Sequence, residues 1–326
     1  MLLAFFVENI IAKTKRLRLV EVVFLLKEIT NHEMDLRLEA AAANEYSENT
    51  KNDLGFNITQ YASNIDNIEI LYTEALNLKL TRTEYINKFI DEHNPDFQNL
   101  KQILGKGDLL TPFLPEEVWA AGVTYKNSEF ERKRESSTPD IYSKVYNSDR
   151  PEIFFKSTGK RLVNPGENVG IRSDSDWNVP EAELAVMLIN NTVIGYSIGN
   201  DMTSRHIEGE NPLYLTQAKI YDKSCSIGPC VIDIESVKNI NNYKISCDIQ
   251  RKSKVIFEGS SRIDLMNKSI ENLISWLQKS NTLPLKSAFL TGTGIVPPPE
   301  FTLKPNDIVN ISIDEIGTLS NKIMSV

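Results

Sequence analysis

The sequence predicts an α+β protein with a β-rich main domain, and two observations lead to this. From about Trp119 onward, short apolar and β-branched runs alternate with Gly, Pro and Asn, a texture typical of many short strands. The first third contains long amphipathic stretches and no proline before Pro95. We therefore expect a smaller N-terminal accessory domain at residues 1–106 and a β-rich domain at residues 107–326, joined by the segment GKGDLLTPFLPEE.

In the first third, two stretches favour amphipathic helices by the spacing of their apolar residues. They are ENIIAKTKRLRLVEVVFLLKEI, residues 8–29, and NIEILYTEALNLKLTRTEYINKFIDEH, residues 67–93. Neither contains a recognisable chemical motif. An accessory role is expected for this part of the chain.

In the remainder, VWAAGVTY at residues 118–125 and EIFFK at residues 152–156 are expected to be short buried strands. NSEFERKRES, residues 127–136, has mixed charges and is expected to be a surface helix. Apolar residues at helical spacing predict an amphipathic helix in KSIENLISWLQKS, with Ile270, Leu273, Ile274 and Leu277 facing a sheet. Alternating apolar residues predict a late strand, followed by a turn at Gly317, with Val309, Ile311 and Ile313 buried.

Three carboxylates stand out because strand pairing would bring them together. Glu181 and Glu183 are two residues apart in a strand-like run, and this spacing points both side chains to one face. Asn190-Asn191 is a tight-turn signal, and VIGYSIGND after it resumes strand composition. If the strands pair about this turn, Asp201 lies opposite Glu181. Three converging carboxylates would suit a hard divalent cation such as Mg2+, with Mn2+ or Ca2+ as further possibilities.

Two acids at this spacing could instead lie on the solvent-exposed face of a strand, which is a common arrangement. Here the run is otherwise apolar on both faces, and buried carboxylates without compensation would cost several kcal/mol. A metal would supply that compensation. The loop TGTGIVPPP, residues 291–299, could cradle a carboxylate with its backbone N–H groups, although glycine-rich turns are common.

Composition excludes several classes of protein. Charged residues make up 25% and hydrophobic residues 41% of the chain, and the formal net charge is -8, so neither nucleic acid nor an anionic membrane is an expected partner. The opening MLLAFFV is too short for a signal peptide, and no run reaches the roughly 18 to 20 apolar residues of a membrane span. The three cysteines, Cys225, Cys230 and Cys247, are expected to be free core thiols. A cytoplasmic location is expected.

Five segments together resemble the fumarylacetoacetate hydrolase family from about Glu117 to the C-terminus. They are RPEIFFK, DSDWNVPEAELAV, the run from Ile194 to Pro229, TGTGIVP and LKPNDIVNISIDEIGTL. The resemblance implies a mixed β-sandwich roll, bound Mg2+ or a similar ion, and a homodimer or homotetramer. The first third does not visibly match the small domain that precedes this fold in the family.

Carried over residue by residue, the resemblance makes Glu181, Glu183 and Asp201 the metal ligands. It places Lys219 beside the metal, facing the substrate, and Glu152 in proton transfer. Thr293 is then expected to bind the substrate carboxylate, and Lys156 to complete the substrate pocket. Without the resemblance, Glu152 could form a surface ion pair with Arg150, Lys219 could be solvated, and Lys156 could merely line a strand end.

The positions of the histidines favour one reaction within the family. Family members that hydrolyse carbon-carbon bonds resemble one another in having a histidine-glutamate pair on a mobile helix, where the imidazole activates water. This chain has only His32, His93 and His206, and none lies in the region of the expected lid helix at residues 127–136. Elimination is therefore favoured over hydrolysis. Within the family, RPEIFFK, ENPLYLTQAKIY and DSDW are most similar to segments of the sugar-acid dehydratases. The resemblance therefore implies a Mg2+-dependent dehydratase converting a 2-keto-3-deoxy pentonate, 2-dehydro-3-deoxy-D-arabinonate, to 2,5-dioxopentanoate and water through a metal-stabilised enolate.

In this mechanism Glu152 is the expected base and Lys219 an electrostatic group; a Schiff base on Lys219 is the less favoured alternative. Two other functions stay open. One is an acylpyruvate hydrolase or oxaloacetate decarboxylase acting on another 2-oxo acid. The other is a non-catalytic, metal-stabilised binding protein.

Overall fold

The computed structural model describes residues 2–7, 21–26, 54–57, 68–93, 98–99 and 111–326. The chain divides into two compact units, one formed by residues 1–113 and 230–238 and the other by residues 114–229 and 239–326. The expected boundary at residue 106 lies outside the described residues.

The first unit contains a small antiparallel arrangement of strands and two helices. The strands β1 (Leu2–Val7), β2 (Glu21–Leu26), β3 (Leu54–Asn57) and β4 (Gln98–Asn99) pair in the order β4-β3-β2-β1. The predicted helical stretch at 67–93 is confirmed as α2 (Ile68–Asn77) and α3 (Arg82–His93). The helix predicted over 8–29 is wrong at Glu21–Leu26, where the β-branched and aromatic run EVVFLL forms a strand; the rest of that stretch lies outside the described residues.

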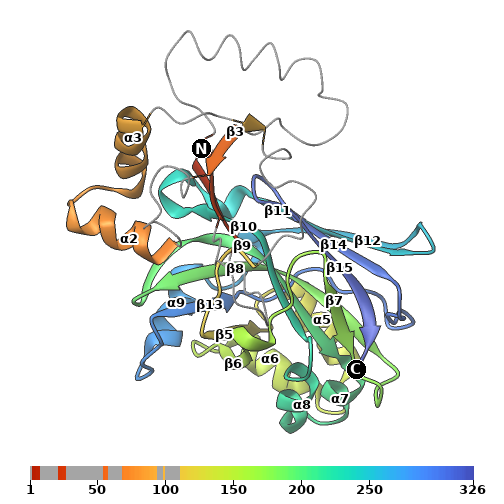
Figure 1. The fold of residues 1–326 in the computed structure, drawn as a ribbon. Helices are drawn as coiled ribbons and strands as arrows, with labels where there is room; N and C mark the ends of the chain where they lie inside the picture. The colour runs from red at the N-terminus through yellow and green to blue at the C-terminus, as the bar shows by residue number, and fades with distance from the viewer. Residues whose placement is uncertain (1, 8–20, 27–53, 58–67, 94–97, 100–110) are drawn as a thin grey trace. The chain divides into compact units, whose positions relative to one another are not determined.

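The second unit contains two sheets (Figure 1). The order in the first is β10-β9-β8-β13-β5-β6, and the order in the second is β12-β11-β14-β15-β7. The first sheet is mixed, since β13 pairs antiparallel with β8 but parallel with β5. Its strands are β5 (Glu117–Gly122), β6 (Glu152–Thr158), β8 (Asn178–Ile189), β9 (Thr192–Ser204), β10 (Cys225–Asp233) and β13 (Lys286–Leu290). Those of the second are β7 (Asn168–Ile171), β11 (Lys244–Arg251), β12 (Lys254–Arg262), β14 (Ile308–Ile313) and β15 (Gly317–Ser325).

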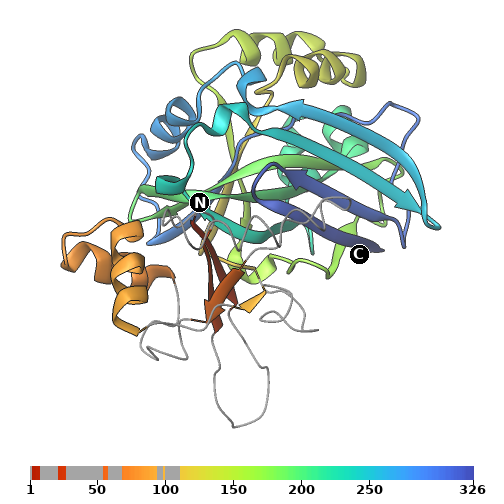
Figure 2. The same ribbon diagram turned by 90° about the horizontal axis from the view of Figure 1, so that it is seen from above.

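The core lies between these sheets, because β8 and β9 contact β11 and β14 (Figure 2). All of β8 and nearly all of β9 is buried. On β14 the residues at 309, 311 and 313 are buried and alternate with exposed or half-buried ones, as the sequence predicts. The three cysteines are buried free thiols, again as expected.

The hairpin of β8 and β9 confirms the expected pairing of Glu181 with Asp201. Asn190 and Asn191 form its turn with φ of 48° and 63°, a conformation that asparagine tolerates better than most residues. The register shifts by one residue between Met187 and Leu188, which leaves Ile194 without a cross-strand partner. This bulge aligns the two acids on one face.

Four helices of the second unit lie next to one another: α5 (Lys126–Glu135), α6 (Pro139–Asn147), α7 (Arg205–Glu210) and α8 (Leu215–Lys219). Helix α5 contacts α6 and α7, and α7 contacts α8. The expectation of a surface helix at 127–136 is wrong for one face of α5, where Ser128, Glu129 and Arg132 are buried. Helix α9 (Ile270–Gln278) is confirmed, with all four predicted apolar positions buried and Ser269 as its N-cap.

Short 3-10 turns complete the described elements, at Gly159–Arg161, Pro212–Tyr214, Ile234–Ser236, Ile240–Asn242 and Ile263–Leu265. Within the described residues, no helix has the length and apolar character needed to cross a bilayer.

Candidate active site

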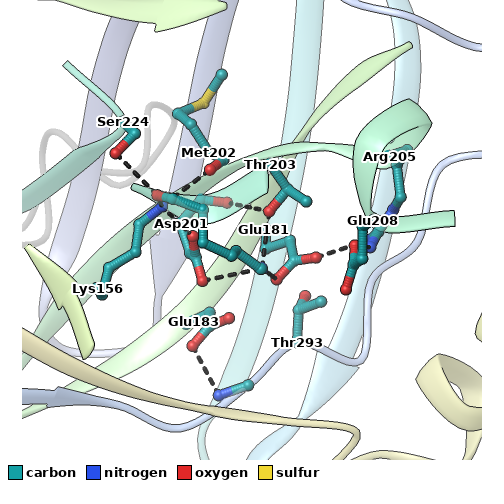
Figure 3. Close-up of polar contacts among 12 residues, drawn as sticks. Lys156, Glu181, Glu183, Asp201, Met202, Thr203, Arg205, Glu208, Ser224 and Thr293 are labelled. Atoms are coloured by element: carbon teal, nitrogen blue, oxygen red, sulfur yellow. Dashed lines mark hydrogen bonds and ion pairs between the residues drawn. The ribbon is translucent and has the colours of Figure 1, made fainter. Parts of the chain in front are cut away.

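Glu181, Glu183 and Asp201 form one buried cluster on the β8–β9 hairpin (Figure 3). Each offers a carboxylate oxygen, and these three oxygens lie within 4.8 Å of one another. All three residues are at most 5% exposed. The period of two along a strand and the cross-strand register together produce this convergence.

Two lysines contact the cluster from different elements. Lys219, at the end of α8, places its Nζ 2.5 Å from Glu181 Oε2 and 3.1 Å from Asp201 Oδ2. Lys156, on β6, places its Nζ 2.5 Å from Asp201 Oδ1, and it donates hydrogen bonds to the carbonyls of Met202 and Lys219. Both ammonium groups are almost completely buried, so they act as fixed charges within the site.

Two arginines approach Glu181 from the opposite side. Glu181 Oε1 lies 2.7 Å from Nη2 of Arg132 on α5 and 2.8 Å from Nη2 of Arg205 on α7. Glu135 and Glu208 contact the same guanidinium groups. This four-residue group, Arg132, Glu135, Arg205 and Glu208, is called the arginine-glutamate cluster below.

The donor set fits a divalent metal ion. In this part of the structure five carboxylates with nearly buried side chains face four cations, which leaves an excess of negative charge. Glu183 Oε1 accepts no hydrogen bond among the described residues, while its Oε2 accepts one from the Gly292 N–H at 2.6 Å. Burial, together with the charges of Asp201 and Glu181, raises the pKa of Glu183 well above its usual value. An oxygen-loving cation would relieve both the charge excess and the unpartnered oxygen.

A small pocket opens beside this centre. Among the predicted residues, Glu152, Glu181, Lys219 and Thr293 line it. Lys156 was expected to bind substrate; it is fully buried and is not among the lining residues.

Glu152, on β6, faces Gly122 across the strand pair β5–β6. A Cβ atom at Gly122 would come within 2.0 Å of Glu152 Oε2, so the carboxyl group uses the space that this glycine leaves. Burial, with the nearby charge of Glu208, raises the pKa of Glu152 to about 7. The alternative partner Arg150 instead stacks on Trp276, its guanidinium carbon 4.5 Å from the ring centre.

No histidine is among the residues that line this pocket. His206 is exposed on α7, and His93 lies on α3 with its Nδ1 3.0 Å from the Phe89 carbonyl. His32 lies outside the described residues. The described site therefore offers carboxylates and cations for its chemistry.

The arginine-glutamate cluster is not among the site residues that the sequence predicts. Two weak signals were present: Glu129, Arg132 and Glu135 recur at intervals of three on one face of a helix, and Arg205 and Glu208 are also three apart. In an isolated helix this spacing is equally typical of solvent-exposed ion pairs. Burial of those faces is a tertiary property.

One pocket combines a buried carboxylate centre, a lysine beside it and a carboxylic acid with a pKa near neutrality. This combination defines a metal-dependent enzyme for a small substrate. The chain belongs to the fumarylacetoacetate (FAA) hydrolase family, whose C-terminal-domain model matches residues 117–324. The expected family and its fold are thereby confirmed.

The chain is similar to two archaeal dehydratases. It is 49% identical over 215 residues to a probable 2-keto-3-deoxyxylonate dehydratase of Haloferax volcanii, covering 66% of this chain and 74% of that protein. It is 42% identical over 232 residues to the 2-dehydro-3-deoxy-D-arabinonate dehydratase of Saccharolobus solfataricus, covering 69% and 78%.

A solved structure extends the similarity over the whole chain. This 2-keto-3-deoxy-D-arabinonate dehydratase, complexed with magnesium and 2,5-dioxopentanoate, has a TM-score of 0.71 and 30% identity, with 100% of this chain and 99% of that chain covered. These relatives agree with the expected dehydratase activity and with magnesium as the cofactor.

Proposed function

We propose that this protein is a Mg2+-dependent hydro-lyase that converts 2-dehydro-3-deoxy-D-arabinonate, or a closely related 2-keto-3-deoxy pentonate, to 2,5-dioxopentanoate and water. The observation that carries this proposal is the placement of Glu152, with a pKa of about 7, in the same pocket as Lys219 and the carboxylate centre. The named activities of the relatives at 49% and 42% identity support the same reaction.

Glu181, Glu183 and Asp201 would hold the metal ion, which supplies Lewis-acid polarisation of the substrate's 2-oxo group. The C3 proton is acidic because it lies next to that group. Glu152 is the proposed base that removes it, and an ionisation near neutral pH suits that task. The protonated Glu152 then returns this proton to the departing C4 hydroxyl, so that water leaves as the C4–O bond breaks. In the resulting C3–C4 alkene, a shift of one proton from C5 to C3 gives the C4–C5 enol. Transfer of the enol hydroxyl proton to C4 then completes 2,5-dioxopentanoate.

Lys219 has an electrostatic role in this proposal. Burial alone would lower its pKa, but the charges of Asp201 and Glu181 outweigh burial and raise the pKa above the usual lysine value. A permanently charged ammonium can stabilise negative charge on the C2 oxygen. It is a poor nucleophile, which argues against a Schiff base.

Thr293 is the proposed contact for the substrate carboxylate, since it lines the pocket on the same loop as Gly292. Its hydroxyl accepts a hydrogen bond from the Ile295 N–H at 3.1 Å, which fixes the side chain in place. Lys156 is proposed to position Asp201 and Lys219 rather than to contact the substrate, because its ammonium contacts both residues from the buried side.

The test is incubation of the purified protein with the 2-keto-3-deoxy pentonate and Mg2+, with and without a chelator. We expect the dioxo product only when Mg2+ is free to bind. Absence of a chelator-sensitive product would refute the proposal. Turnover of oxaloacetate or an acylpyruvate in its place would favour the alternative enzyme, and metal-dependent stability without any turnover would favour a binding protein.

We further propose a cytoplasmic homodimer or homotetramer, as the family resemblance and the buried free cysteines suggest. Light scattering on the eluted protein tests the assembly, and fractionation of the source cells tests the location.

A further inference from the structure

Arg132 is the residue of α5 that reaches the proposed metal centre. Its side chain is 6% exposed, and its guanidinium faces three carboxylates from three elements. Its Nη2 lies 2.7 Å from Glu181 on β8, its Nη1 lies 2.7 Å from Glu135 on the same helix, and its Nε lies 3.5 Å from Glu208 on α7. A planar fork with several donors suits such a junction, whereas a lysine offers a single point of charge.

The contact to Glu181 involves only one oxygen of that carboxylate. Oε1 faces Arg132 and Arg205, and Oε2 faces Lys219 on the side where Asp201 also lies. The two guanidinium groups therefore fix the orientation of the Glu181 carboxylate. In that orientation Oε2 points toward the other two carboxylates of the cluster. Partners of metal ligands commonly act in this way, and their loss typically weakens metal binding or activity by about 10- to 100-fold.

A second arginine of the same helix, Arg134, does not share the buried environment of Arg132. Arg134 has a side chain that is 53% exposed, and it pairs with Glu131 on its own helix. Exposed pairs of this kind contribute little. The buried Arg132 joins α5 to a residue of another element, and that residue belongs to the metal centre.

We propose that Arg132 is a positioning residue that orients Glu181 for metal binding and couples the placement of α5 to occupancy of the metal site. Coupling between two sites is reciprocal. Metal bound at Glu181 should therefore stabilise α5, and loss of Arg132 should remove that effect. This inference rests on the metal site of the proposed function, but it does not depend on the substrate or the reaction.

The experiment compares wild type, Arg132→Met, Arg132→Lys and the matched control Arg134→Met, without substrate. Calorimetric titration measures the Kd for Mg2+, and hydrogen exchange of the α5 peptide is followed with and without Mg2+. We expect Arg132→Met to raise the Kd by about 10- to 100-fold and to abolish protection of α5 by Mg2+. Arg132→Lys should recover the affinity only in part, and Arg134→Met should match wild type.

An unchanged Kd together with unchanged Mg2+-dependent protection in Arg132→Met would overturn the inference. If that variant does not fold, Arg132→Lys carries the test, because it keeps a positive charge at this position while removing the forked guanidinium that contacts Glu181 and Glu135. Its Kd for Mg2+ should rise and the protection of α5 by Mg2+ should fall, and wild-type values of both would overturn the inference. A wild-type protein that binds no Mg2+ would instead refute the metal site itself.

Discussion

Glu181 and Asp201 face each other across the β8–β9 hairpin, and the ammonium of Lys219 contacts both, at 2.5 Å and 3.1 Å. One cation is thus shared by acids of two strands. Among the described residues, Glu183 forms no ion pair, whereas Glu181 and Asp201 both do, so the three carboxylates are not equivalent. Glu183 is the proposed ligand for which a bound metal would make the greatest electrostatic difference.

Glu183→Gln should therefore weaken Mg2+ binding strongly while keeping the fold. The amide oxygen can still accept from the Gly292 N–H, but the negative charge is lost. We expect a fall in affinity of about 100-fold, or roughly 3 kcal/mol, measured by calorimetric titration. Glu258→Gln, at an exposed strand position, is the matched control. Equal affinities for the two variants would contradict the assignment of Glu183 as a ligand.

Glu152→Gln should abolish turnover and leave Mg2+ affinity within a few-fold of wild type. In the wild-type enzyme, the base must be ionised, so kcat/KM should fall as pH decreases below the pKa of Glu152, which is about 7 without metal. A nearby metal charge would move this transition to lower pH. Rate measurements between pH 5 and 9 test this expectation, and a rate that rises as pH decreases would exclude Glu152 as the base.

The same substitution should stabilise the metal-free protein at alkaline pH. The pKa of Glu152 is about 7 in the folded state, against a usual value of 4.5. Below pH 4.5 the carboxyl group is neutral in both states; as pH rises through 7, the folded state must carry a poorly solvated charge and loses stability. At pH 8 we expect Glu152→Gln to be more stable than wild type by about 1 to 3 kcal/mol, with no such gain at pH 4. Denaturant unfolding measures the difference, and the reverse ranking at pH 8 would contradict the raised pKa.

Gly122→Ala should displace the Glu152 carboxylate without removing it. The added Cβ would lie 2.0 Å from Oε2, and the side chain of Glu152 is the part free to shift. We expect kcat to fall by about 10- to 100-fold, since a misplacement of about 1 Å has this effect in catalytic sites. Mg2+ affinity should stay within a few-fold of wild type, because the change acts on Glu152 and not on the three converging carboxylates. An unchanged kcat, or a tenfold loss of Mg2+ affinity, would show that Gly122 does not act through Glu152.

Lys156→Met separates positioning from substrate contact. Loss of the buried ammonium leaves Asp201 Oδ1 without its cation, and breaking such a pair costs about 3 to 5 kcal/mol of folding stability. A positioning role predicts a lower kcat with little change in KM, whereas a substrate contact predicts a higher KM. Steady-state kinetics and denaturant unfolding test both expectations, with the exposed Lys160→Met as the control.

The local patterns predicted a large part of the fold. Alternation along β14 and the apolar spacing of α9 are properties of a single element, and burial of those faces followed the prediction. The stretch EVVFLL was misjudged as helical because a short apolar run has no clear period, and strand pairing with β1 decided its conformation.

By itself, the sequence determined which acids can meet, since Glu181 and Glu183 share a strand face and Asp201 follows one turn later. A tight two-residue turn alone would have paired Glu181 with Asn200 and pointed Asp201 to the other face. The one-residue bulge at Ile194 shifts the register and corrects this. Only the tertiary structure decided that bulge, the burial of Lys156 behind Asp201, and the approach of Arg132 from α5. These features depend on packing between elements far apart in the chain, and no local period encodes that packing.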